Sequence, residues 1–369
     1  MYWAPIDQSA VRARPERSIA AINSAAVVLF SLFVLCSDRV SVASFVELAA
    51  SYIGISLIIL GFAVVLYAGQ VLVRTGFASK WTESPTRALV SAFGKRWRDD
   101  RMFCLIWPVA LFLLLMPTFN AFKQRILPQA GFHYDKQLAE LDRFLLGTDP
   151  GLWLHRAVGS PTTTRLLDAV YHSWFVPTTL GLCLVGLCAT PRTRCQYVTA
   201  YIAVWILLGG VLAYLFPAAG PAFYSDLVDA AGAAPFVAVQ QQLDAAGASG
   251  GFLTSIHNQA YLLKNLDSPT LVVGGGISAI PSIHNAMAVL FAIVSFRINR
   301  ILGLVMSAFA AIIWVASVYL NWHYAVDGLA GGLGAIVLWS LSGKIVDRLF
   351  RSKLSADVAA GTLEIPAAA

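Results

Sequence analysis

Three residues near the C-terminus have the types and the spacing that phosphoryl transfer needs. His323 and Asp327 are four positions apart, so on a helix they share one face. A carboxylate beside one imidazole nitrogen sets the tautomer and leaves the other nitrogen free to attack phosphorus. His284 supplies a second imidazole, which can protonate a leaving oxygen and then deprotonate an acceptor. The pattern predicts a catalytic site made of two histidines and one aspartate.

The residues before His284 predict a phosphate-binding helix N-terminus. Pro281-Ser282 precedes an apolar run, and Ser282 is a suitable N-cap. The free N–H groups of a helix start attract an anion, and Gly274-Gly275-Gly276 would let the backbone approach it closely. The simpler interpretation is that the histidines only pack and that the i,i+4 pair only satisfies a polar contact. We favour function, because an ionisable group at membrane depth is costly and generally serves a site.

The composition identifies an integral membrane protein. Of the 369 residues, 58% are hydrophobic and 12% are charged, about half the charged fraction of a soluble domain. The mean hydropathy is +0.69. The net charge of +6 does not indicate nucleic-acid binding, because the basic residues collect in short loops between apolar runs. The five cysteines form no Cys-x-x-Cys pair, so neither a zinc site nor a disulfide framework is expected.

The apolar runs predict an all-α polytopic membrane bundle with eight spans. The expected spans cover residues 19–36, 48–73, 102–119, 166–189, 196–216, 281–297, 301–321 and 325–346. The expected organisation is two N-terminal helices with a basic cytoplasmic segment (1–101), a six-span core (102–350) and a cytoplasmic tail (351–369). Within the core, we expect an interfacial helix in 127–160 and a site-capping loop in 217–279.

Basic residues in alternate loops predict that both termini are cytoplasmic. The segment 120–165 conflicts with this, since it carries six basic residues on the predicted outer side. We keep the orientation because long loops follow the rule weakly. In this topology His284, His323 and Asp327 all fall in the outer leaflet. The expected location is a bacterial inner membrane with the site on the periplasmic side.

Two motifs resemble signatures of a known family, the type 2 phosphatidic acid phosphatase superfamily. Pro281-Ser282-Ile283-His284 is similar to its second signature, and His323-Tyr324-Ala325-Val326-Asp327 to its third. The resemblance covers the six-span core, chiefly 215–335. It implies a mechanism without metal or cofactor, in which His323 forms a phosphohistidine, Asp327 orients it and His284 is the general acid.

Other segments resemble one branch of that superfamily, the inositol phosphorylceramide synthases. Ser317–Tyr324 is similar to that branch, which moves a phospho-headgroup between lipids. Gly220-Pro221 and Tyr171-His172-Ser173-Trp174 are similar to it as well. The resemblance makes Gly220, Pro221 and His172 candidates for substrate binding.

The chain departs from the superfamily pattern in its cationic residues. The first signature, a lysine followed by Arg-Pro, is absent, and Phe216–Pro221 stands near its expected place. The Ser-Arg expected before the third-motif histidine is replaced by Ala316-Ser317. The phosphate therefore lacks an obvious cationic partner. The candidates from the outer segments are Lys264, Arg143 and Arg165. Tyr324 is expected in the outer aromatic belt with Tyr171, Trp174 and Trp322, and substrate contact is its alternative role.

The leading prediction is a lipid phosphotransferase that passes a phospho-headgroup from a phospholipid to a lipid alcohol through His323. Phosphoinositol is the headgroup that the resemblance implies. The closest alternative is a lipid phosphate phosphatase, because water can replace the alcohol with the same residues. A third alternative, from another class, is a non-catalytic transporter or assembly protein. Transporters often show broken spans in paired halves, and the sequence has no such pairing.

Overall fold

The chain folds as a helical membrane bundle. The computed structural model describes residues 14–37, 39–80, 82, 84–98, 103–249 and 251–359. Within these ranges there is no strand, and seven helices are long and apolar enough to cross a membrane. The predicted all-α polytopic architecture is therefore confirmed.

The helices follow one another in the order that the apolar runs predict. The first half contains α1 (Arg14–Leu35), α2 (Val42–Ser79), α3 (Pro85–Arg98), α4 (Phe103–Arg125), α5 (Asp135–Leu146), α6 (Pro150–Val158), α7 (Pro161–His172) and α8 (Phe175–Cys188). The second half contains α9 (Pro191–Ala203), α10 (Ala213–Leu215), α11 (Tyr224–Leu227), α12 (Ala234–Ala248), α13 (Thr254–Lys264), α14 (Ile283–Ile298), α15 (Arg300–Tyr319) and α16 (Ala325–Ala359). Three shorter segments are η1 (Leu127–Ala130), the π-helical η2 (Val204–Leu212) that joins α9 to α10, and η3 (Pro221–Phe223).

The helix α14 lies within two residues of the span predicted at 281–297. It has 16 residues and is apolar but shorter than the seven long helices. The segment before it is extended and buried, with Ile277 and Ala279 each 1% exposed. Non-helical backbone is tolerated at membrane depth where protein covers it. Seven of the eight predicted spans are therefore long apolar helices, and the eighth is this shorter helix, which packs against α15 and α16 inside the bundle.

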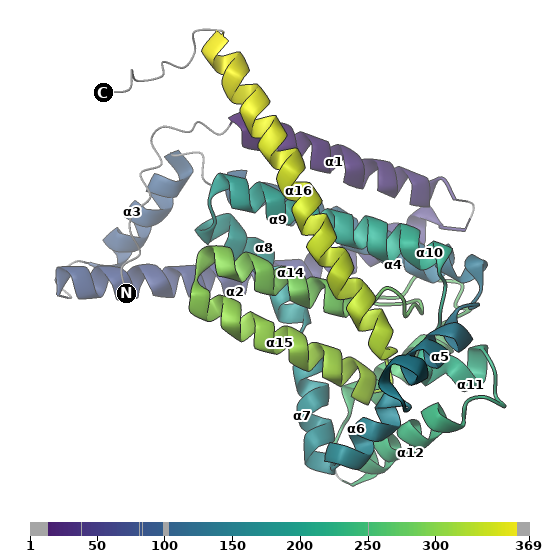
Figure 1. Cartoon of the computed structure of the whole chain (residues 1–369). Helices are drawn as coiled ribbons and strands as arrows, with labels where there is room; N and C mark the ends of the chain where they lie inside the picture. The colour runs from purple at the N-terminus through teal and green to yellow at the C-terminus, as the bar shows by residue number, and fades with distance from the viewer. Residues whose placement is uncertain are drawn as a thin grey trace.

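Short helices form a cap at one end of the bundle. Figure 1 shows α5, α6, α11 and α12 gathered at the lower right, beside the start of α16. The single interfacial helix predicted in 127–160 is instead divided among η1, α5 and α6. The break between α5 and α6 follows from Gly147, whose φ of 70° ends α5, and from Pro150, which starts α6. The predicted capping loop contains α11, α12 and α13.

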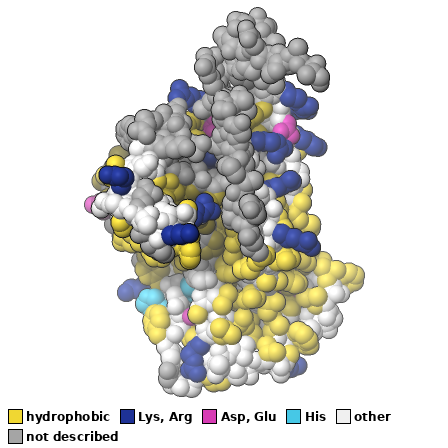
Figure 2. Space-filling model, turned by 90° about the vertical axis from the view of Figure 1, so that its left-hand side faces the viewer, with side chains coloured by type: hydrophobic (Ala, Val, Ile, Leu, Met, Phe, Trp, Pro, Cys, Tyr) yellow, Lys and Arg dark blue, Asp and Glu magenta, His cyan; other side chains and the backbone are white. Residues whose placement is uncertain are grey.

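The opposite end of the bundle carries the basic loops. Figure 2 views the molecule from that side, and Lys and Arg side chains gather over its upper half. There, α1 is joined to the core by a buried ion pair, in which Arg194 Nε lies 2.5 Å from Glu16 Oε1. The helix α16 continues to Ala359, beyond the boundary where the sequence predicts a tail. The rest of that tail and the arginine-bearing residues 1–13 lie outside the described residues.

Candidate active site

His284 lies in the first turn of α14, whose start is capped as the sequence predicts. The Ser282 hydroxyl accepts hydrogen bonds from Asn285 N at 3.4 Å and Asn285 Nδ2 at 3.0 Å. The Ser282 backbone N–H donates to the carbonyl oxygen of Asp327 at 3.2 Å. This last bond ties the second motif directly to the third.

His323 lies in a tight turn between α15 and α16. The backbone N–H groups of Trp322 and His323 both donate to the carbonyl of Ser317, at 2.9 and 3.1 Å. Asn321 adopts a left-handed backbone with φ of 63°, a conformation that asparagine tolerates better than most residues. The turn places His323 just before the N-terminus of α16, where Asp327 begins the helix.

The structure brings the three predicted catalytic residues together. The ring centroids of His284 and His323 are 5.8 Å apart, at an interplanar angle of 59°. His323 Nδ1 lies 3.6 Å from Asp327 Oδ2, an ion-pair distance slightly longer than a hydrogen bond. Asp327 is fully buried. The arrangement can stabilise positive charge on the His323 imidazole while a second imidazole stands close by.

Aromatic side chains hold the His284 ring in place. The Tyr171 ring stacks on it at a centroid distance of 4.9 Å, and the Trp174 ring lies at 4.4 Å. Trp174 Nε1 also donates to the His284 carbonyl at 3.0 Å. Both aromatic residues are 3% exposed. In the structure these two residues are part of the wall of the site.

Two buried aspartates on α5 hold the segments around the site, and neither is among the site residues predicted from the sequence. Asp142 accepts hydrogen bonds from the backbone N–H groups of Ala325 and Val326, at 2.7 and 2.9 Å, and so caps α16. Asp135 accepts from the backbone N–H groups of Ala219 and Gly220, each at 2.8 Å. The aspartates are seven residues apart, which places them on one helix face. That spacing is the sequence signal that could have identified them.

Burial changes the acid–base properties of this network. Desolvation raises the pKa of Asp142 to about 6, against the opposing effect of its two backbone hydrogen bonds. Desolvation also raises the pKa of Asp135 above its usual value. Tyr324 donates its phenol hydrogen to Asp135 Oδ1 at 2.9 Å. Burial and that neighbouring carboxylate raise the pKa of Tyr324 well above the usual range for a phenol.

The predicted substrate-binding residues Gly220, Pro221 and Tyr324 lie around His323. Gly220 has a φ of 100°, and a Cβ at this position would lie 2.8 Å from the carbonyl oxygen of Trp322. Pro221, Tyr324 and His323 line one pocket. The Tyr324 hydroxyl is already committed to Asp135. Tyr324 is therefore placed to shape the pocket rather than to donate to a substrate.

Two of the glycines before the second motif lie against the end of α4. A Cβ on Gly276 would lie 2.5 Å from the Lys123 carbonyl oxygen, and a Cβ on Gly275 would lie 2.5 Å from Gln124 Oε1. Asn120 and Gln124 hold the same loop, each donating to a loop carbonyl and accepting from a loop N–H. Gly275 and Gly276 thus allow the chain to lie on α4.

His172 lies next to the site and within a separate polar cluster. Its Nδ1 is 3.3 Å from Asp168 Oδ1, and its Nε2 is 3.3 Å from Asn258 Nδ2. Its ring meets the Tyr171 ring edge to face at 5.4 Å. His172 therefore contacts the wall of the site rather than the His284–His323 pair.

None of the three predicted cations has a described contact with His284 or His323. Lys264 is exposed at the end of α13, and Arg143 lies 3.6 Å from Asp149. Arg165 packs its side chain near Gly251. Lys123, in the last turn of α4, has a charge that acts on His284. Its ammonium group forms no ion pair or hydrogen bond with another described residue, and the sequence analysis had treated it only as a loop charge.

Comparison with known proteins gives one match. A family model described as the PAP2 superfamily matches residues 136–341, more than half of the chain. The matched range contains both histidine motifs and most of the cap. No curated protein and no solved structure matches the chain.

Proposed function

The chain belongs to the PAP2 superfamily, and on that premise we propose that it transfers a phospho-headgroup between lipids through a phosphohistidine on His323. Members of this family are generally phosphatases or phosphotransferases that act on lipid-type substrates. The observation that carries the proposal is the 5.8 Å separation of the His284 and His323 rings, with a buried carboxylate 3.6 Å behind His323.

The proposed reaction has two displacements at phosphorus. His323 Nε2 attacks the phosphorus atom, the bond to the donor's alkoxide oxygen breaks, and His284 protonates that oxygen. Asp327 stabilises the positively charged ring. His284 then takes the proton of the acceptor hydroxyl, whose oxygen attacks phosphorus and breaks the N–P bond. The acceptor leaves with the phospho-headgroup, and both histidines return to their starting states.

We assign phosphate binding to Lys123 and to the N-terminus of α14. Lys123 is the cation whose charge acts on His284, and no described acidic group neutralises it. The first N–H groups of α14 belong to the helix start that carries His284, and such a helix start favours an anion. Together they would supply the positive charge that the missing first signature leaves open.

The remaining parts of the proposal concern the identity of the donor and acceptor and the side of the membrane that the site faces. The stretch Ser317–Tyr324 makes phosphoinositol lipids and ceramide-type alcohols the first donor and acceptor to test. Hydrolysis is the second candidate, because the pocket beside His323 opens to solvent and water could act as the acceptor. We infer that the site faces away from the cytoplasm, since it lies at the end of the bundle opposite the basic loops.

The test uses purified protein in nanodiscs with donors labelled in the headgroup phosphate, with and without ceramide or diacylglycerol. A labelled lipid that requires both the acceptor and His323 would support transfer, and soluble label released at the same rate without acceptor would indicate hydrolysis.

Lys123→Gln should raise KM for the donor, whereas the exposed Lys264→Gln should not. EDTA should leave the rate unchanged. Full activity in His323→Ala would contradict the proposal.

A further inference from the structure

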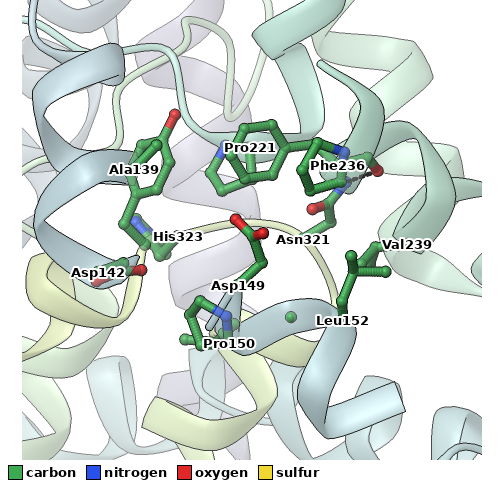
Figure 3. Close-up of a pocket in the computed structure, with 14 residues that line it drawn as sticks. Ala139, Asp142, Asp149, Pro150, Leu152, Pro221, Phe236, Val239, Asn321 and His323 are labelled. Carbon is green, nitrogen blue, oxygen red and sulfur yellow. Dashed lines mark hydrogen bonds between the residues drawn. The ribbon is translucent and has the colours of Figure 1, made fainter. Parts of the chain in front are cut away.

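A pocket adjoins His323 on the cap side of the site. Its volume is about 350 Å³, including space that is open to solvent. The walls are mostly apolar and come from the start of α6, from α12 and from the turn before α16 (Figure 3). His284 is not among the lining residues. The enclosed part of this space is small, so a ligand here would also occupy the part that is open to solvent.

Asn321 presents a hydrogen-bond acceptor to this pocket, and a relay of amides fixes its orientation. The Leu320 carbonyl can only accept, so Gln259 must donate to it through Nε2, at 2.9 Å. Gln259 Oε1 then accepts from Gln240 Nε2 at 3.2 Å, and Gln240 Oε1 accepts from Asn321 Nδ2 at 3.3 Å. Asn321 Nδ2 also donates to the Phe236 carbonyl at 3.1 Å. Asn321 Oδ1 is therefore left as an acceptor without a described donor, on a residue only 2% exposed.

Asp149 supplies the second acceptor. It occupies the N-cap position of α6, yet its side chain makes no capping hydrogen bond. The carboxylate lines the pocket instead, and in Figure 3 it lies between His323 and Asn321. Its only described ionic partner is Arg143, whose Nη1 lies 3.6 Å from Asp149 Oδ1. A carboxylate whose described partner is one arginine at 3.6 Å, and an amide oxygen without a described donor, thus face the same space.

We propose that this pocket binds the headgroup of the donor lipid, and that the headgroup carries hydrogen-bond donors, either hydroxyl or ammonium groups. This inference rests on the proposed function. Attack and departure occur roughly in line through phosphorus, so the substituent that stays on phosphorus lies to the side of that axis. A pocket beside His323 suits this substituent. Because the free polar atoms of Asp149 and Asn321 are acceptors, the ligand must supply the donors.

The test compares phospholipid donors with identical acyl chains in nanodiscs. Phosphatidylinositol and phosphatidylglycerol offer hydroxyls, phosphatidylethanolamine offers an ammonium, and phosphatidylcholine and phosphatidic acid offer no headgroup donor. Diacylglycerol release gives kcat/KM, and native mass spectrometry gives lipid retention. The wild type should favour one of the first three over phosphatidylcholine by about tenfold or more, the effect expected of a hydrogen bond to a charged group. Asp149→Asn should reduce that ratio, and the exposed carboxylate variant Asp226→Asn on α11 should leave it unchanged.

Each outcome bears on the inference. Preference for an inositol or glycerol headgroup identifies hydroxyls as the ligand, and preference for ethanolamine identifies the ammonium. Equal use of phosphatidylcholine, a preference for phosphatidic acid, or an unchanged ratio in Asp149→Asn would overturn the inference. Selective lipid retention that Asp149→Asn abolishes, without any turnover, would support the pocket and contradict the proposed function. Turnover without headgroup preference would support the proposed function and contradict the headgroup pocket.

Discussion

Gly331 of α16 lies directly against the backbone of Ser282 at the start of α14. A Cβ at position 331 would collide with the Ser282 carbonyl and approach its nitrogen to 3.3 Å. This contact and the hydrogen bond from Ser282 N to Asp327 O hold the two motifs together. The distance between His284 and His323 therefore depends on a glycine that neither motif contains.

Gly331→Ala should separate the two motifs and lower kcat by tenfold or more. The neighbouring backbone cannot move aside as a side chain could, so the added methyl should also reduce the free energy of unfolding by about 1–3 kcal/mol. Gly332→Ala is the matched control, because its Cβ would meet only a Val289 methyl at 3.3 Å. Activity and thermal unfolding of both variants in nanodiscs give the comparison. Equal behaviour of the two variants would show that this close approach is unimportant.

Asp327→Asn should preserve the fold and slow turnover by at least a hundredfold. The asparagine oxygen can still accept the N–H of Tyr324, which donates to Asp327 Oδ2 at 3.2 Å. The lost negative charge can no longer stabilise a positively charged His323 ring. Thermal unfolding should change little while kcat falls. Wild-type kcat in this variant would remove Asp327 from the mechanism.

Asp142→Asn should change how stability depends on pH. The pKa of Asp142 is about 6 in the folded protein and about 4 in an unfolded chain. The folded state therefore binds the extra proton, and this contribution to stability is present below about pH 4 and is lost as pH rises through 6. Thermal unfolding between pH 4 and 7 should show a shallower decline for the variant than for the wild type. Parallel curves would contradict the raised pKa.

Asp142→Asn should also weaken the N-terminus of α16 at neutral pH. The amide can accept only one of the two hydrogen bonds from Ala325 and Val326, so a loss of about 1–2 kcal/mol in the free energy of unfolding is expected. Asp226→Asn removes the same charge from an exposed position of the cap and serves as the control.

Arg194→Ala should destabilise the bundle without altering the chemistry of the site. The change leaves Glu16, which is 1% exposed, as a buried carboxylate whose described partners are Trp107 and Cys104. Loss of one partner of a buried pair costs about 3–5 kcal/mol. Arg192→Ala breaks an exposed pair with Asp347 and should cost only about 0.2–1 kcal/mol. Equal losses in thermal unfolding would mean that burial of the first pair is unimportant.

The convergence of His284, His323 and Asp327 could be predicted because topology and motif position pointed to the same end of the bundle. The extended backbone of residues 277–282 before α14 could not, because it depends on burial of that segment by other parts of the protein. The role of Asp135 and Asp142 could not be predicted from the sequence either. Their partners are backbone N–H groups more than 80 residues away, which no side-chain pattern reveals.

The cation was missed for a related reason. Lys123 was counted among the charges of a long loop, whereas α4 continues to Arg125 and carries the lysine to the site. Helix ends are the least certain part of a sequence prediction. The predicted span ends at residue 119 and so leaves Lys123 in a loop, whereas in the structure Lys123 lies in the last turn of α4.

The most direct test of the central claim is to trap the covalent intermediate. Wild-type protein would be mixed with donor labelled at the headgroup phosphorus, denatured in alkali within one turnover, and digested for peptide mapping. The account predicts a label that is stable in alkali, labile in acid and attached to His323, and that is absent from His323→Ala. Label on another residue, or label that persists in His323→Ala, would contradict the account.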